Sequence, residues 1–268
     1  MMKEKKGSHE HQTAKQKNSQ VYIVGESPLV EEYAELCASK GYGVLIAWNV
    51  PRESQRAFIS SAIKSSTTIP SSASIGLELT NIDVQQKRKN LERLDKSLAP
   101  TAPLLSSSVT VSATEQSSWI VQKHRLVGIG ALPTLIEKQL VEVAPTVFSP
   151  SETVQVVARF YASLGKEIEL VQDRIGMVLP RILCQIINES IFAVTDDVAS
   201  PADIDSAMKL GANYPSGPIE WAEKIGVRHI HAVLTALQND LNEDRYRISP
   251  LLKQMAIAGE WWKSQTTN

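Results

Sequence analysis

The sequence predicts an α/β domain built on a mostly parallel sheet, followed by an α-helical C-terminal domain. From residue 20 to residue 172, short β-branched and aromatic runs alternate with amphipathic helical runs, the pattern of a parallel sheet covered by helices. From residue 173 to the end, the apolar residues follow helical spacing. The chain has 268 residues, 43% of them hydrophobic, which is enough for two modest domains.

The composition excludes several classes of protein. The net charge is −1, so we expect neither nucleic acid nor a membrane surface as a partner. No apolar run reaches the roughly 18 residues that a membrane span requires, and no signal-peptide pattern is present, so we expect a cytoplasmic protein. Cys37 and Cys184 lie in apolar helical contexts and are predicted to be buried reduced thiols, not a disulfide or a metal site.

The first residues differ in composition from the rest of the chain. Residues 1–19 contain almost no apolar side chains and are mildly basic, which predicts a disordered tail. His9 and His11 lie in this tail and are interpreted as solvated side chains, not as metal ligands.

The α/β domain is predicted to begin with a β-α-β unit. A strand at 20–24 is followed by Gly25, a helix at 28–40 and a second strand at 44–47, the usual frame of a dinucleotide site. The remaining predicted elements follow in order. They are a possible helix at 56–64, a strand at 75–80, a charged helix at 83–98, an element at 103–111, a short helix at 115–121, strands at 126–133 and 139–143, a helix at 149–164 and a strand at 168–171.

The C-terminal domain is organised around a capped helix and a rigid turn. Ser200 is a good N-cap, and Pro201 suits the first helical position. Gly211 ends the helix, and a proline-rich turn leads to further helices at 218–225 and 228–241. The preceding helix, at 175–194, is apolar nearly all round, which predicts burial inside a domain or a dimer.

The amino-acid sequence of this region resembles that of a known family. The run DIDSAMKLGANYPSGPIEW at 203–221 resembles the C-terminal domain of the NAD-dependent 3-hydroxyacyl-CoA dehydrogenases, and Gly176, Arg181 and the run RYRISPLL at 245–252 extend the likeness. The resemblance implies a Rossmann-like NAD-binding domain at 20–172 and a helical domain at 173–268. It also implies oxidation of (S)-3-hydroxyacyl-CoA thioesters in fatty-acid β-oxidation, NAD as cofactor, and a homodimer or heterodimer formed through the helical domain.

The glycine fingerprint of the cofactor site is degenerate. Only Gly25 of the G-x-G-x-x-G pattern is present, because Ser27 and Val30 stand where the second and third glycines fall. Glu26 adds a negative charge beside the expected phosphates. The acidic residue that holds the ribose falls at 48–49, which carries no carboxylate. These changes predict an αβ unit that binds a dinucleotide poorly.

A second family stretch matches in part. Glu78 and Lys87 match the family pattern, whereas the carboxylate that the family places near the cofactor falls at Ile82. Lys87 is either a contact for a phosphate or CoA group or an exposed helix lysine. The candidate cofactor-binding residues are therefore Gly25, Ser27, Glu78 and Lys87.

The catalytic histidine of the family has no counterpart here. In the family the histidine takes the hydroxyl proton while a glutamate twelve positions later holds its tautomer. Glu142 occupies the glutamate position, and counting back from it reaches Gly130. His124 lies six residues before Gly130 and would need an unusual register to act instead.

Two substrate contacts of the family also fall on unsuitable residues. The serine that binds the 3-oxygen falls at Val109, and the substrate-contacting asparagine falls at Pro180. Thr110 offers a hydroxyl, but strand alternation predicts that it points to the other face.

Three hypotheses follow from these residues. The first is a non-catalytic family relative, kept as an acyl-CoA binder or as the dimer partner of an active enzyme, with Glu142 retained without its histidine. The second is a weak or altered NAD(P)-dependent 3-hydroxyacyl-CoA oxidoreductase, which needs another base. The third is a structural or regulatory protein that binds neither ligand. The changes span cofactor binding and chemistry alike, which favours the first hypothesis.

Overall fold

The computed structural model describes residues 19–49 and 60–259. Residues 1–18 of the predicted disordered tail, with His9 and His11, and the first four residues of the possible helix at 56–64 lie outside the described residues. The end of that predicted helix is wrong, because residues 63–65 form a strand.

An eight-stranded sheet forms the centre of the first domain in the part of the chain that the structure describes. The strands are β1 (Gln20–Gly25), β2 (Gly43–Trp48), β3 (Ile63–Ser65), β4 (Ile75–Leu79), β5 (Leu104–Ser107), β6 (Leu126–Ile129), β7 (Leu140–Pro145) and β8 (Glu167–Leu170). Their order is β3-β2-β1-β4-β5-β6-β7-β8, and every neighbouring pair is parallel except β6 with β7. The predicted mostly parallel sheet is therefore confirmed.

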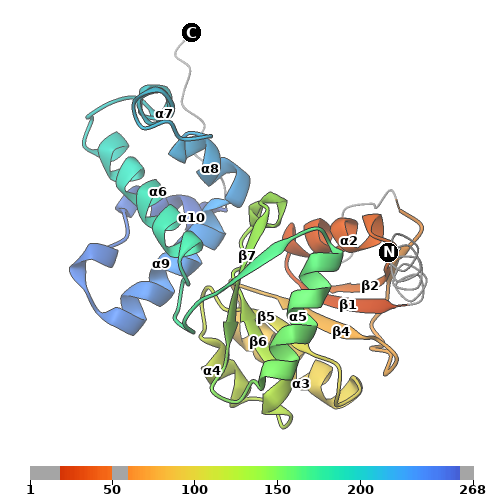
Figure 1. Cartoon of the computed structure of the whole chain (residues 1–268). Helices are drawn as coiled ribbons and strands as arrows, with labels where there is room; N and C mark the ends of the chain where they lie inside the picture. The colour runs from red at the N-terminus through yellow and green to blue at the C-terminus, as the bar shows by residue number, and fades with distance from the viewer. Residues whose placement is uncertain (1–18, 50–59, 260–268) are drawn as a thin grey trace, which may run out of the picture.

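Helices cover both faces of this sheet (Figure 1). Alternate residues of β1 serve the two faces: Val21 and Ile23 join one core cluster, whereas Tyr22 and Val24 join another. The first cluster packs against α2 (Leu29–Ser39) and α5 (Ser151–Ser163), and the second packs against α3 (Val84–Ser97). Short helical turns complete the domain: α4 (Ala113–Ser117), η2 (Lys123–Arg125) and η3 (Leu135–Glu137).

The second domain is entirely helical in the described residues and forms a separate lobe beside the sheet (Figure 1). Its elements are α6 (Leu179–Thr195), α7 (Pro201–Gly211), α8 (Pro218–Ile225), α9 (Val227–Leu241), η4 (Asp244–Tyr246) and α10 (Pro250–Ala258). Ser200 caps α7 by accepting the Asp203 N–H, as the sequence predicts. The core of this lobe also takes in Val109, Leu132 and Leu135 of the sheet domain, so apolar packing is continuous between the two domains.

The start of α6 differs from the prediction. Gly176 and Met177 have positive φ angles of 77° and 47°, so the chain turns before the helix begins at Leu179. Pro180 then lies in the first turn, where its missing N–H breaks no helical bond. The helix is not buried all round, because Ile182 is 52% exposed.

Two composition-based expectations can be compared with the described residues. Cys37 and Cys184 are buried free thiols, and burial raises the pKa of Cys37 to about 12, so these predictions are confirmed. No helix within the described ranges is long and apolar enough to cross a membrane.

Candidate active site

The carboxyl ends of the parallel strands form the candidate site. Because β1 lies between β2 and β4, the strand order reverses direction at β1, and a ligand crevice is expected outside the ends of β1 and β4. Gly25 ends β1 at this place. A Cβ added to Gly25 would lie 2.5 Å from the carbonyl carbon of Leu79 in β4. The first fingerprint glycine is therefore required by the close approach of two strands, whether or not a cofactor binds.

Glu26 fills the mouth of this crevice with its own carboxylate. Its Oε2 accepts the backbone N–H of Asn81 at 3.0 Å. Its Oε1 accepts the backbone N–H groups of Ile82 at 3.1 Å and Asp83 at 3.2 Å. Glu26 is only 8% exposed. The negative charge that the sequence places beside the expected phosphates therefore already has three donors of its own.

The start of α2 offers few donors to a ligand. Pro28 occupies the N-cap position and has no N–H. Ser27 and Pro28 line a cavity of about 570 Å³ that reaches to the α8–α9 turn, where Gly226 and His229 form the opposite wall. Val30, at the third glycine position, is fully buried.

The end of β2, where a ribose-binding acid is expected, carries an indole. Trp48 Nε1 donates to Glu31 Oε1 of α2 at 2.9 Å. Glu31 is 3% exposed. Asn49 turns the other way and donates to Thr80 Oγ1 at 2.7 Å. Both side chains at this position are therefore bound to other residues of the sheet domain.

The family resemblance implies NAD, and the residues present do not fit it in the manner of the fingerprint. The Glu26 carboxylate occupies the crevice at the ends of β1 and β4, Pro28 removes a donor at the start of α2, and Trp48 replaces the ribose acid. We therefore derive no catalytic step through a dinucleotide.

Glu78 and Lys87 form a buried ion pair instead of facing a cavity. Both side chains are 0% exposed, and the Lys87 ammonium donates to Glu78 and, at 3.1 Å, to Ser106 Oγ. Asn90 Nδ2 donates to the other Glu78 oxygen at 3.2 Å. The interpretation of Lys87 as an exposed helix lysine is wrong. A phosphate contact would require this pair to open.

Gly130 and Glu142 are neighbours across β6 and β7. The Gly130 N–H donates to the Glu142 carbonyl at 3.0 Å, and a Cβ added to Gly130 would lie 3.6 Å from Glu142 Oε2. Position 130, which the family spacing reaches from Glu142, therefore lies beside Glu142 in the structure. His124 is exposed on the turn η2 before β6, at the opposite end of that strand from Gly130, so it does not lie beside Glu142.

The Glu142 carboxylate has another partner. Its Oε2 accepts the backbone N–H of Val178 at 2.8 Å, and its Oε1 accepts that of Leu179 at 2.6 Å. These N–H groups belong to the first turn of α6, which has no intrahelical acceptors for them. Gly130, Glu142 and Pro180 together line a small cavity of about 240 Å³. Glu142 thus joins the sheet domain to the helical domain.

Val109 and Thr110 take opposite roles. Val109 is fully buried in the core of the helical domain, so it cannot face a substrate. Thr110 lines the cavity between the domains, and its buried Oγ1 has no hydrogen-bond partner among the described residues. Thr110 points away from Val109, as expected, but Thr110 and not Val109 lines the cavity; β5 ends at Ser107, so this is not a result of strand alternation.

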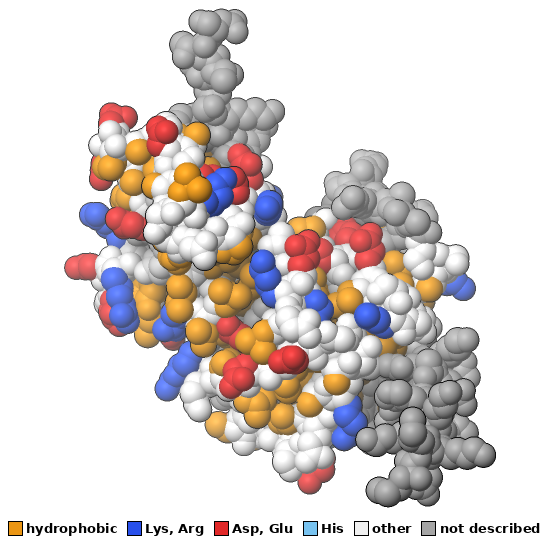
Figure 2. Space-filling view, turned by 45° about the horizontal axis from the view of Figure 1, so that its top comes forward, with side chains coloured by type: hydrophobic (Ala, Val, Ile, Leu, Met, Phe, Trp, Pro, Cys, Tyr) orange, Lys and Arg blue, Asp and Glu red, His pale blue; other side chains and the backbone are white. Residues whose placement is uncertain are grey.

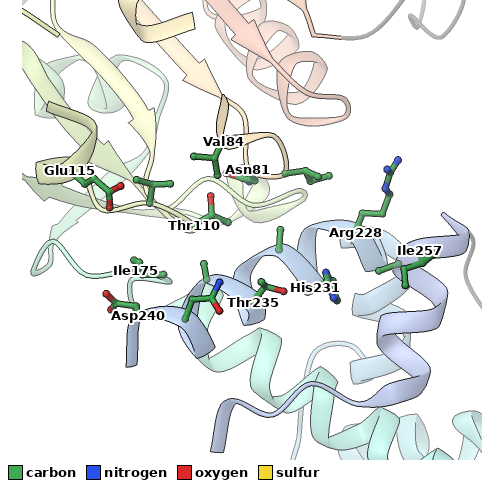
Figure 3. Close-up of a pocket in the computed structure, with 16 residues that line it drawn as sticks. Asn81, Val84, Thr110, Glu115, Ile175, Arg228, His231, Thr235, Asp240 and Ile257 are labelled. Carbon is green, nitrogen blue, oxygen red and sulfur yellow. The ribbon is translucent and has the colours of Figure 1, made fainter. Parts of the chain in front are cut away.

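The cavity between the domains has a volume of about 590 Å³. From the sheet domain, Asn81, Thr110 and Glu115 line it (Figure 3). From the helical domain, α9 lines the other side with polar side chains, of which Figure 3 labels Arg228, His231, Thr235 and Asp240. Asn239 of the same helix also lines the cavity. In the space-filling view, hydrophobic side chains gather where the two lobes meet (Figure 2).

His231 is a functional candidate that the sequence reasoning missed. It lies in this cavity, and burial, together with the nearby Lys253, lowers the pKa of its imidazole below 6.5. Its base form therefore dominates at neutral pH. The spacing of Arg228, His231 and Thr235 along α9 is the available signal, since residues three and four apart share a helix face. Within the described ranges, no group of acidic, histidine or cysteine side chains could hold a metal ion.

Comparison with known proteins identifies relatives of this chain. Residues 176–266 match the family model "3-hydroxyacyl-CoA dehydrogenase, C-terminal domain". The 3-hydroxybutyryl-CoA dehydrogenase of Bradyrhizobium diazoefficiens is 32% identical over 68% of this chain and 61% of its own length. The probable 3-hydroxybutyryl-CoA dehydrogenase of Bacillus subtilis is 31% identical over 70% of this chain and 65% of its own length. The chain thus spans less than two thirds of these relatives.

A solved structure agrees over a longer range. The crystal structure of (S)-3-hydroxybutyryl-CoA dehydrogenase from Ralstonia eutropha has a TM-score of 0.74 to this chain and is 25% identical to it, covering 90% of this chain and 94% of that protein. The sheet domain and the helical domain therefore both have counterparts in one protein of this kind. Together with the match of residues 176–266, these likenesses show that the chain belongs to the 3-hydroxyacyl-CoA dehydrogenase family.

Proposed function

We propose that the protein binds 3-hydroxyacyl-CoA or 3-oxoacyl-CoA thioesters in the cavity between its domains and does not perform the histidine-assisted hydride transfer of the family. One observation carries the proposal: position 130, beside Glu142, is a glycine, and both Glu142 oxygens are held by the first turn of α6. Loss of a general base costs about 10²–10⁴-fold in rate. The relatives named as 3-hydroxybutyryl-CoA dehydrogenases supply the substrate class.

The lining of the cavity suits a thioester ligand. Ile82, Val84 and Ile175 supply apolar walls for an acyl chain, and the free Thr110 hydroxyl supplies a polar contact for a 3-oxygen or a thioester carbonyl. Arg228 adds a positive charge at the start of α9, and in this proposal it pairs with a phosphate of CoA at the edge of the cavity.

A second candidate is an altered NAD(P)-dependent 3-hydroxyacyl-CoA oxidoreductase. The names of the relatives favour it, and so does a neutral His231 in the same cavity as Thr110. His231 would then serve as the base from the helical domain. This candidate also requires a dinucleotide to displace the Glu26 carboxylate.

We also propose that the helical domain pairs with a second subunit. Val178, Leu179 and Ile182 at the start of α6 are 49%, 41% and 52% exposed, so they form an uncovered apolar strip on this element. Sedimentation of the chain and of Ile182→Glu tests this role: a dimer that dissociates in the variant supports it, and a monomeric parent contradicts it.

The main experiment compares binding with turnover. Thermal unfolding is measured with acetoacetyl-CoA and with NADH separately, and NADH oxidation is followed with both present. We expect acetoacetyl-CoA to raise the unfolding temperature without turnover. Turnover at ordinary dehydrogenase rates contradicts the main proposal and supports the second candidate. No shift with acetoacetyl-CoA contradicts both candidates.

Thr110→Val is the informative variant, with Thr153→Val as its control. Thr110→Val keeps the shape but removes the free hydroxyl from the cavity, so the acetoacetyl-CoA shift is expected to shrink. Thr153 lies on α5, and its hydroxyl donates to the His124 carbonyl at 3.3 Å, outside the cavity. The control is therefore expected to keep the full shift.

A further inference from the structure

The turn between β4 and α3 presents three consecutive backbone N–H groups to one point. They belong to Asn81, Ile82 and Asp83, and all three donate to the same carboxylate. Successive amides that converge in this way form a concave site for an anion. The turn therefore has the geometry of an anion-binding site at the carboxyl edge of the sheet.

The anion in this site is a side chain of the same protein. Glu26 is held there by its backbone as well: its N–H donates to the Leu79 carbonyl at 3.2 Å, and its carbonyl accepts the Val30 N–H at 3.1 Å. The first bond ties Glu26 to β4 and the second ties it to α2. The carboxylate is thus fixed from two elements and is 8% exposed.

The Glu26 carboxylate lies at the switch point of the strand order, where doubly wound sheets bind nucleotides. Glu26 follows β1, and its three donors follow β4, so the bonds span the point at which the strand order reverses. On the neighbouring side, Trp48 at the end of β2 is bonded to Glu31 of α2. Side chains therefore occupy both the place where a phosphate is expected and the neighbouring place where a ribose is expected.

We infer that Glu26 is an internal ligand of this crevice, standing where the phosphate of a nucleotide would be held, and that it excludes dinucleotides from the native protein. A phosphate needs the same N–H groups and carries the same sign of charge, so the two anions exclude each other. Removal of the Glu26 side chain leaves three converging amides free and opens the crevice to a phosphate-bearing ligand.

The experiment measures NADH binding by fluorescence titration to the full chain, to Glu26→Ala and to Glu223→Ala. Glu223 is an exposed acid on the far wall of the same cavity, so its variant removes one negative charge without freeing the amides. We expect weak binding to the parent and to Glu223→Ala. Glu26→Ala is expected to bind NADH about 10- to 100-fold more tightly, the gain typical of freed charge-assisted hydrogen bonds.

Inorganic pyrophosphate, tested by thermal shift, separates the phosphate from the rest of the nucleotide. Stabilisation of Glu26→Ala, but not of the parent, by pyrophosphate supports a freed anion site. Circular dichroism checks folding, and Glu26→Gln is the second variant, since its amide keeps the size of the side chain but loses the charge. A parent that binds NADH as tightly as Glu26→Ala overturns the inference. So does a folded Glu26→Ala or Glu26→Gln with no gain for either probe.

This outcome is separate from the proposed function, because neither probe is an acyl-CoA and turnover is not measured. A failed NADH result leaves the acetoacetyl-CoA shift to decide the proposed function by itself.

Discussion

The crevice over β1 and β4 and the cavity between the domains lie side by side but treat their polar groups in opposite ways. In the crevice, the backbone amides of Asn81, Ile82 and Asp83 are bound by Glu26. In the cavity, the buried hydroxyl oxygens of Thr110 and Thr235 have no partner among the described residues. Buried polar atoms are nearly always paired in native proteins, so unpaired ones call for a ligand or water. This difference is the reason that the proposed ligand is placed in the cavity and not in the crevice.

The largest expected loss of stability comes from breaking the buried ion pair between Lys87 and Glu78, which lies behind the crevice. Lys87→Met leaves Glu78 buried without its cation, which is expected to cost about 3–5 kcal/mol of unfolding free energy. Urea denaturation measures it. Arg88→Met is the control on the same helix, because its ion pair with Glu92 is solvent-exposed and such pairs contribute about 0–1 kcal/mol. Equal losses of unfolding free energy in the two variants would contradict the burial of the Lys87–Glu78 pair.

The pH dependence of stability tests the burial of His229, which lies on α9 beside the loop that follows β1. Burial lowers its pKa to about 4, from 6.5. Between these values the unfolded chain takes up a proton that the folded protein does not, so stability is complete above pH 6.5 and falls as the pH drops toward 4. The expected loss over this window is about 3 kcal/mol.

The variant His229→Gln isolates this contribution. It is needed because burial also raises the pKa of Glu32 to about 7, which changes stability with pH in the opposite sense. Urea midpoints measured from pH 4 to pH 7 are expected to differ in slope between the parent and the variant. Parallel profiles would mean that His229 is not buried in the folded protein.

Glu142 joins β7 of the sheet domain to the first turn of α6. Glu142→Ala leaves the Val178 and Leu179 N–H groups without their acceptor and is expected to cost about 1–3 kcal/mol. Thermal denaturation measures it, with exposed Glu137→Ala as the control on the adjacent turn η3. If Glu142 only supported catalysis, its removal would leave stability unchanged.

The smallest effect on stability is expected at Thr110. Thr110→Val replaces an unpaired buried hydroxyl with a methyl group of similar shape, so the free energy of unfolding is expected to stay within about 1 kcal/mol of the parent or to rise. The acetoacetyl-CoA shift is expected to fall in the same variant. A large loss of stability would instead place this hydroxyl in the structural network of the domain.

Much of the fold could be predicted from local patterns. The β-α-β start at 20–47 and the capped helix after Ser200 follow from alternation, helical spacing and turn residues, which depend on near neighbours in the chain. The pairing of Gly130 with Glu142 could also be predicted, because two adjacent strands with a short connection keep a fixed spacing.

Most of the candidate site could not be predicted, because its contacts join residues that lie far apart in the sequence. The Glu26 carboxylate meets amides more than fifty residues away, as the separation of 55 from Asn81 shows. Lys87 lies on a charged helix and is nevertheless buried, because Glu78 of β4 faces it. Thr110 follows a strand that ends earlier than its sequence suggests, and His231 acquires its surroundings only when α9 meets the sheet domain.

The two hydrogen bonds that Glu142 makes to α6 have a consequence for how such chains are recognised. They give Glu142 a structural role in a chain that has glycine at position 130, because the first turn of α6 needs an acceptor at the contact between the domains. A glutamate at this position therefore reports the contact between the two domains, and it becomes a marker of catalysis only in a chain that also carries an imidazole at position 130.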